Sequence, residues 1–129
     1  MALYLLDTDT IIDFLNQVPR TQGFLADLVA REENLSSCDV VIAEVYAGLY
    51  PNQEEAAADF LPTLQCLTTS QAAAEQAGRW RFEYARRGRT LPVIDALIAA
   101  TALDRGATIV TANLRDYPMP EVSVLPLPR

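Results

Sequence analysis

Short apolar runs alternate along this chain with stretches of helical periodicity. The clearest run covers residues 3–6 and is closed by Asp7, which is typical of a strand buried on both faces. The pattern predicts further strands at 35–38, 66–68, 108–111 and 122–125. The segments between them predict helices, which are expected after Asp7 and over 24–31, 40–49, 52–64, 70–87 and 93–104. Strands that alternate with helices indicate one α/β domain over residues 1–129, with a parallel sheet covered on both faces.

Local signals refine the boundaries of these helices. Asp39 is expected to cap the helix over 40–49, and Asn52 the helix over 52–64, which Pro62 should kink or end. In the helix over 70–87, a stripe at helical spacing is expected to face the core. It consists of Ala73, Ala77, Trp80 and Tyr84. The helix over 93–104 is apolar all round except for Asp95, so we expect it to be buried.

The composition removes several classes of catalytic site. The chain has 129 residues, no His, and ten basic residues that are all Arg. A His base, a His-ligated zinc, a Schiff-base Lys and a phosphate-loop Lys are therefore impossible. Carboxylates, hydroxyls, thiols and Arg remain as candidate catalytic groups.

Charge and cysteine content bear on partners and location. The net charge of -7 disfavours indiscriminate binding to nucleic acid or to an anionic membrane, so such contacts must be local. Cys38 and Cys66 fit no disulfide framework or thiolate metal site, and we expect buried free thiols in a reducing cytoplasm. No signal peptide or membrane span is predicted, which favours a cytoplasmic protein.

Four acids lie in apolar stretches of the sequence, where a buried charge is unfavourable unless it is paired or binds a metal. They are Asp7 at the end of the first strand, Glu44, Asp95, and Asp116 after the fourth strand. Each has a bland explanation: Asp95 suits a helix dipole, Asp116 an Asx-turn, and Glu44 can reach solvent. In an open α/β sheet, however, strand ends and helix starts share one edge, where these carboxylates can converge. Clustered carboxylates repel one another unless a cation such as Mg²⁺ or Mn²⁺ neutralises them, which indicates metal-assisted phosphodiester hydrolysis.

The same residues lie in motifs that resemble those of PIN domains. The motifs are LLDTDT (5–10), IAE (42–44) with AGL (47–49), PVIDALIAATA (92–102) and VTANLRDY (110–117). They occur in the family's order over nearly the whole chain, and the strongest similarity is to VapC-like ribonuclease toxins of type II toxin-antitoxin systems.

The resemblance implies a fold, an activity and partners. It implies an α/β/α sandwich with a five-stranded parallel sheet, and an endoribonuclease that uses Mg²⁺ or Mn²⁺. It also implies an RNA substrate, a small DNA-binding antitoxin and a homodimer. Asp7, Glu44, Asp95 and Asp116 match the family's four acids, of which Asp7 and Asp95 would mainly hold the metal. Thr111 and Asn113 match the polar residues that support the last acid, whereas Asp9 stands where the family commonly has an uncharged polar residue.

Five of the ten arginines lie within residues 79–89, together with a single acid, Glu83. These arginines are candidate RNA contacts: Arg79, Arg81, Arg86, Arg87 and Arg89. The alternative is that cations gather there because the helix dipole favours them at a C-terminus. Trp80 and Tyr84 are able to stack on bases, but their spacing fits the core.

Three other functions compete with the toxin. The D-x-D start also resembles haloacid-dehalogenase-type phosphatases, but Ile11 departs from that pattern and the later Lys cannot exist here. A degenerate nuclease fold that only binds is a second alternative, which the presence of all four acids disfavours. The third is a housekeeping RNA-processing nuclease.

Overall fold

The computed structural model describes residues 2–128 and contains a five-stranded sheet in which every neighbouring pair is parallel. The strand order is β3-β2-β1-β4-β5. The strands are β1 (Leu3–Leu6), β2 (Asn34–Cys38), β3 (Gln65–Leu67), β4 (Thr108–Thr111) and β5 (Val124–Pro126). The predicted α/β class and five parallel strands are therefore confirmed.

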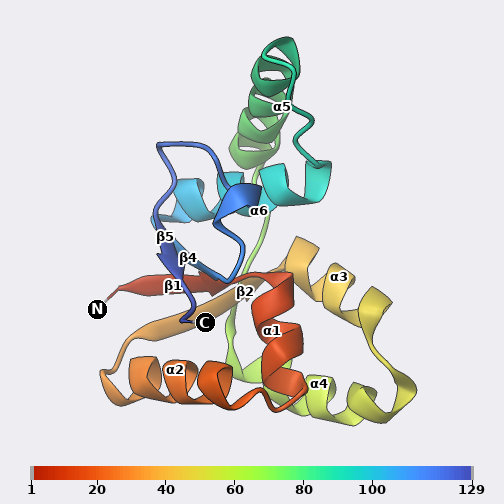
Figure 1. Cartoon of the computed structure of the whole chain (residues 1–129), viewed down its shortest axis with the longest axis vertical. Coiled ribbons are helices and arrows are strands. Elements are labelled where there is room, and N and C mark those ends of the chain that lie inside the picture. Colours follow the sequence, from red (N-terminus) through yellow and green to blue (C-terminus); the bar gives the residue numbers. More distant parts are fainter. Residues whose placement is uncertain (1, 129) are drawn as a thin grey trace.

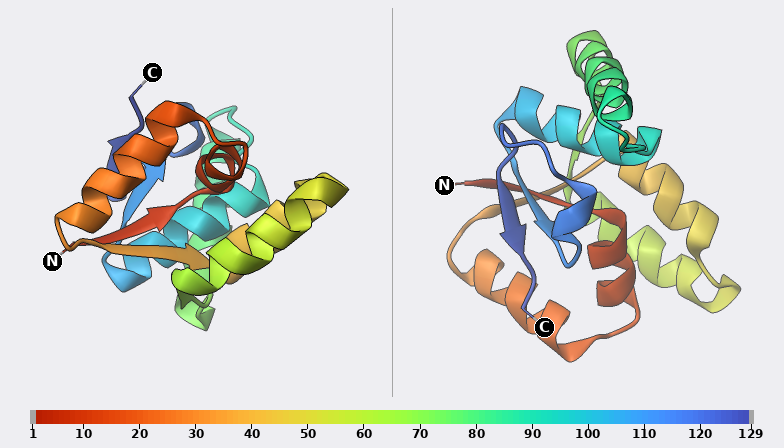
Figure 2. Two further views of the ribbon diagram at one scale, coloured as in Figure 1. Left: turned by 90° about the horizontal axis from the view of Figure 1, so that it is seen from below. Right: turned by 45° about the horizontal axis from the view of Figure 1, so that its top comes forward.

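Six α-helices within residues 2–128 connect and cover the strands. They are α1 (Thr8–Leu15), α2 (Pro19–Ala30), α3 (Asp39–Gly48), α4 (Glu54–Phe60), α5 (Gln71–Arg86) and α6 (Val93–Arg105). Figure 1 shows α1 and α2 on one side of the sheet and α6 on the other, with α5 packed outside α6. The two further views in Figure 2 show the same layered arrangement.

The core lies between these layers. Leu5 and Leu6 of β1 and Ile109 and Val110 of β4 are fully buried, as continuous apolar strands require. The α5 stripe that includes Trp80 is also buried, as its spacing predicts. In α6 the prediction of burial all round is wrong, because Val93 and Leu103 are 45% and 41% exposed at its two ends.

The region between α3 and β3 differs most from the predicted single helix. It consists of a 3₁₀ turn (Pro51–Gln53), α4, and a second 3₁₀ turn (Leu61–Thr63) that contains Pro62. Asn52 does not cap α4; instead Gln53 precedes the helix, and its side chain accepts a hydrogen bond from the Tyr50 backbone N–H at 3.1 Å.

Two further local predictions are wrong. Asp39 is the first residue of α3 and Cys38 is its N-cap; the Asp39 carboxylate accepts hydrogen bonds from Val40 and Thr69. Cys66 is exposed rather than buried, because it lies on β3 at the edge of the sheet. In residues 2–128, no helix has the length and apolar character needed to cross a bilayer.

The chain order of the strands creates a switch point at the centre of the sheet. From β1 the chain moves outward to β2 and β3, and then returns to the other side of β1 to form β4 and β5. Connections on opposite faces leave a crevice beyond the carboxyl ends of β1 and β4. Asp7 follows β1 directly, and Thr111 is the last residue of β4, so both lie at this edge.

Candidate active site

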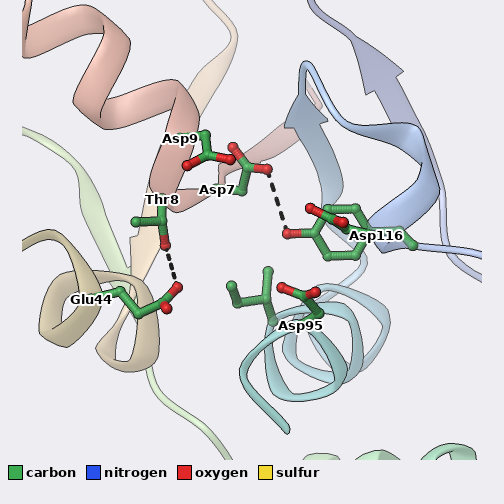
Figure 3. A pocket seen from close by; sticks show the side chains of 8 residues that line it. Asp7, Thr8, Asp9, Glu44, Asp95 and Asp116 are labelled. Carbon is green, nitrogen blue, oxygen red and sulfur yellow. Dashed lines mark hydrogen bonds between the residues drawn. The ribbon is translucent and has the colours of Figure 1, made fainter. Parts of the chain in front are cut away.

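A pocket of about 170 Å³ opens at the switch point, and all four predicted acids line it (Figure 3). They come from four places in the chain: the end of β1, the middle of α3, the first turn of α6 and the 3₁₀ turn Leu114–Asp116. Four further residues complete the lining, namely Thr8, Asp9, Ile98 and Tyr117. None of the residues that line it is basic.

Asp7 is the most buried of the acids, with 3% of its surface exposed. It is the N-cap of α1: its Oδ1 accepts hydrogen bonds from the Thr10 backbone N–H at 3.0 Å and from the Thr10 hydroxyl at 2.7 Å. Burial raises the pKa of Asp7, and hydrogen bonds from Thr111 and Thr10 partly oppose that rise. One carboxylate thus anchors a helix and faces the pocket.

Glu44 reaches the pocket from the middle of α3, where it is half-buried. Its Oε1 accepts a hydrogen bond of 2.7 Å from the Thr8 hydroxyl in the first turn of α1 (Figure 3). This bond joins two helices that pack together and holds the carboxylate at the pocket that it lines. The bland interpretation, that Glu44 simply reaches solvent, does not describe this arrangement.

Asp95 carries the clearest electrostatic signature of the site. Its pKa is raised to about 6, first by burial and then by repulsion from Asp116, Glu44, Asp7 and Asp9. The first turn of α6 is a favourable place for one isolated acid, because the helix dipole stabilises negative charge there. Repulsion from four neighbouring acids instead indicates that Asp95 belongs to a cluster of carboxylates rather than standing alone at a helix start.

Asp116 is placed by a chain of hydrogen bonds from the end of β4. The Thr111 hydroxyl accepts a hydrogen bond from the Asn113 N–H at 2.9 Å, and the Asn113 carbonyl accepts one from the Asp116 N–H at 3.1 Å. Burial and the charge of Asp9 raise the pKa of Asp116, whereas Arg89 lowers it. Asp9 is itself exposed and lines the pocket, so it adds a fifth carboxylate.

The five candidate arginines do not share the same surroundings. Arg89 lies close enough to Asp116 to act on its charge, and its guanidinium donates to the Arg115 carbonyl. Arg81 donates to the Leu91 carbonyl at 2.9 Å, and Arg79 pairs with Glu75 one turn away at 3.4 Å. Of these three arginines, Arg89 is the one linked electrostatically to an acid of the pocket.

Arg86 and Arg87 stack on aromatic rings at the end of α5. The Arg86 guanidinium lies 5.5 Å from the centre of the Phe82 ring, and that of Arg87 lies 4.4 Å from the centre of the Tyr84 ring. Tyr84 is a core residue, as predicted, whereas Phe82 is 64% exposed. These contacts are compatible with either interpretation of the arginine cluster, because stacked guanidinium groups keep their charge available to phosphates.

The donor set of the pocket suits a hard divalent cation. Every candidate ligand is a carboxylate or hydroxyl oxygen, which are the ligands that Mg²⁺ and Mn²⁺ prefer. A bound cation would also neutralise the negative charges that repel one another in the pocket. Within residues 2–128, no three acids are gathered closely enough to hold one ion as they stand. A cation bound here would offset the mutual repulsion of these carboxylates.

Three residues that hydrogen-bond to the pocket acids have no role predicted from the sequence. Thr8 and Thr10 each donate to an acid of the site, and Tyr117 donates to Asp7. The spacing of Asp7 and Thr10 is that of an N-cap and its third helical residue, which is a signal that the sequence contains. Nothing local to the sequence shows that Thr8 faces Glu44, 36 positions away.

Comparison with known proteins identifies relatives over most of the chain. The profile of the PIN domain matches residues 4–122. Ribonuclease VapC19 of Mycobacterium tuberculosis is 30% identical over 115 residues, which cover 89% of this chain and 92% of that protein. The tRNA(fMet)-specific endonuclease VapC of Salmonella typhimurium is 30% identical over 122 residues, or 91% of each chain.

Solved structures show the same arrangement. The crystal structure of DNA-bound VapBC from Salmonella typhimurium matches with a TM-score of 0.84 and 25% identity, covering 99% of this chain and 100% of that chain. VapBC2 from Rickettsia felis, bound to a DNA fragment from its promoter, matches with a TM-score of 0.81 and 25% identity, covering 96% and 98%. The resemblance therefore extends through the described fold and includes the segments that line the pocket.

Proposed function

We propose that this chain, which belongs to the PIN-domain family and whose relatives are VapC ribonucleases, is a metal-dependent endoribonuclease with its catalytic centre in the carboxylate pocket. The observation that supports this most is the convergence of Asp7, Glu44, Asp95 and Asp116 on a pocket lined by no basic side chain. Gathering several carboxylates in one pocket costs free energy, so such an arrangement is expected where a bound cation offsets their repulsion.

The roles of the acids follow from their surroundings. The principal ligands are Asp7, which is the buried acid, and Asp95, whose charge is repelled by the other four acids. The cation is Mg²⁺ or Mn²⁺. When bound, such an ion polarises the scissile phosphate and makes water nucleophilic near neutral pH. Glu44 and Asp116 complete the ligand set or orient the water that attacks in line with the leaving oxygen. Thr111 and Asn113 hold the loop that presents Asp116.

Arginines supply the phosphate contacts that a Lys-free chain requires. Arg89 acts electrostatically on Asp116 and is assigned to the phosphate beside the scissile bond. Arg86 and Arg87, together with Arg79 and Arg81, extend this charge along α5, which packs on the helix that carries Asp95. The overall charge of -7 disfavours indiscriminate binding of RNA, so its contacts with the chain must be local.

The biological assignment is the toxin of a toxin-antitoxin pair acting in the cytoplasm. The two solved structures described above are VapBC complexes on DNA, so we infer that this chain binds a small DNA-binding antitoxin. We further propose that the chain is a homodimer. Inducing the chain in a bacterial host should arrest growth, and co-expressing the antitoxin should restore it. If the neighbouring antitoxin gene is deleted and the active protein still leaves growth of its own organism unchanged, the chain is instead an RNA-processing nuclease.

Direct titration with Mn²⁺ tests the metal site independently of RNA. Calorimetry should show binding to the wild-type chain and its loss in Asp95→Asn, while Asp59→Asn, which changes an exposed acid of α4, should bind as the wild type does. A cation that binds only the folded state also stabilises it, by about 2.7 kcal/mol at a hundred times its Kd. Equal binding by Asp95→Asn and Asp59→Asn would exclude Asp95 as a ligand.

A further inference from the structure

Tyr117 follows Asp116 in the chain, but its hydroxyl is directed at Asp7. The residue is 6% exposed, and its ring is part of the hydrophobic core. The hydroxyl donates to Oδ2 of Asp7 at 3.5 Å, the bond drawn to Asp7 in Figure 3, and within residues 2–128 this is its one hydrogen bond. The two residues are 110 positions apart and meet only because β1 and β4 are neighbours.

The hydroxyl is not needed for packing. A phenyl ring fills the same core position, and burying a hydroxyl costs free energy unless the group is hydrogen-bonded. Within the described structure, the bond to Asp7 is what offsets that cost. The position of Tyr117 is therefore best explained by what the hydroxyl does to that carboxylate.

The other oxygen of Asp7 is already fixed. Oδ1 accepts both hydrogen bonds from Thr10, and the Thr10 hydroxyl also lies 2.9 Å from the Val110 carbonyl of β4. With Oδ1 held by the start of α1, a partner at Oδ2 limits the remaining rotation of the carboxyl group. The Tyr117 hydroxyl is the donor at Oδ2 and also lines the pocket, and the Thr111 side chain is a further hydrogen-bond partner of this carboxyl group.

We propose that Tyr117 is a positioning residue of the catalytic centre, whose hydroxyl holds Oδ2 of Asp7 in the orientation that receives the divalent cation. This inference rests on the proposed function, because it assumes that Asp7 is a ligand. Groups that hydrogen-bond to metal ligands orient them, and their loss typically costs 10- to 100-fold in metal affinity or activity. The bond is long, as catalytic hydrogen bonds often are before a substrate or ion binds.

The test compares Tyr117→Phe with two reference variants. Tyr84→Phe removes a hydroxyl from another buried tyrosine, one that does not line the pocket. Asp7→Asn removes the ligand itself. The first measurement is the Kd for Mn²⁺ without RNA, and the second is cleavage of a single-stranded oligoribonucleotide over a range of Mn²⁺ concentrations.

Tyr117→Phe should raise the Kd for Mn²⁺ by about tenfold. Its cleavage rate should need correspondingly more Mn²⁺ to reach half its maximum, while the KM for RNA at saturating Mn²⁺ stays at the wild-type value. Tyr84→Phe should match the wild type in all three quantities. In wild-type protein labelled with ¹³C at tyrosine Cζ, adding Mg²⁺ should shift the resonance of Tyr117, a measurement that needs no folded variant.

The outcomes separate this inference from the proposed function. A Kd of Tyr117→Phe equal to that of Tyr84→Phe, with Asp7→Asn unable to bind, would overturn the role of Tyr117 and leave the metal site standing. Wild-type affinity in Asp7→Asn would overturn both. A Tyr117 resonance that does not respond to Mg²⁺ contradicts the inference even if the variant fails to fold.

Discussion

The Thr8 hydroxyl donates a 2.7 Å hydrogen bond to Oε1 of Glu44 and thereby joins the start of α1 to the middle of α3. Thr8 directly follows Asp7, so the same turn that places one acid of the pocket also orients a second. The two acids are thus coupled through the backbone of α1.

Replacing Thr8 with Val should separate these effects. The substitution keeps the β-branched shape and removes only the donor, so Glu44 loses its orientation while Asp7 keeps both bonds from Thr10. We expect Mn²⁺ affinity or cleavage to fall by about 10- to 100-fold. Thr68→Val, at an exposed position outside the pocket, is the control. Equal activity of the two variants would show that Glu44 needs no such partner.

The repelled charge on Asp95 predicts how stability depends on pH. Its pKa is about 6 in the folded chain, above the ordinary value of 3.8, so the folded state binds its proton more tightly than the unfolded state does. This contribution is fully favourable below pH 3.8 and is lost as pH rises through 6. Without metal, the free energy of unfolding measured by urea titration should therefore increase as pH falls from about 7.5 to about 5.

Asp95→Asn supplies the matched comparison for that pH dependence. The amide cannot ionise, so the variant should lose part of this pH dependence and be the more stable chain at about pH 7.5 without metal. With Mn²⁺ added, the wild type should become the more stable chain, because only the wild type has the Asp95 carboxylate that binds the ion. Identical pH profiles for the two chains would mean that Asp95 is not repelled by its neighbours.

Much of this site is predictable from the sequence because its acids stand out against apolar surroundings. The run over 3–6, the end of α6 at Gly106 and the buried stripe of α5 likewise follow from local pattern and backbone conformation. Gly106 adopts a φ of 66°, the left-handed conformation that glycine accepts most readily at the end of a helix.

The remaining features depend on contacts that are distant in the chain. In the sequence, Tyr117 is an ordinary neighbour of Asp116, and only the folded sheet brings it to Asp7. Pro19 is the first residue of α2, but the predicted helix over 24–31 begins later because Gly23 and the polar residues before it obscure the amphipathic pattern. The 3₁₀ turns around α4 arise where Pro51 and Pro62 interrupt helical hydrogen bonding.

Substitution of Thr10 should lower the free energy of unfolding and not only the activity of the site. Its side chain is fully buried, and the hydroxyl lies between the Asp7 carboxylate and the Val110 carbonyl. Thr10→Val leaves these acceptors with fewer donors, which should lower the free energy of unfolding by about 1–3 kcal/mol. Denaturant titration at neutral pH measures this. A loss within about 0.5 kcal/mol, the range typical of surface substitutions, contradicts the prediction.

Arg86 and Arg87 separate RNA binding from helix stabilisation. Their joint replacement with Ala should weaken binding of single-stranded RNA and reduce the salt dependence of log K by about 0.7 for each phosphate that the variant no longer neutralises. Metal affinity should not change, because neither side chain lines the pocket. An unchanged salt slope with a less stable α5 would assign both residues to the helix end.

The central claim is that the carboxylate pocket cleaves RNA with the help of a divalent cation. Its most direct test is cleavage of a single-stranded oligoribonucleotide, at the sites that the wild type selects, by purified wild type, Asp95→Asn and Asp59→Asn, with Mg²⁺ or Mn²⁺ and with a chelator. We predict that wild type and Asp59→Asn cut only when the metal is present, and that folded Asp95→Asn does not cut above background. Cleavage that survives the chelator, or that persists at the wild-type rate in Asp95→Asn, would contradict the account.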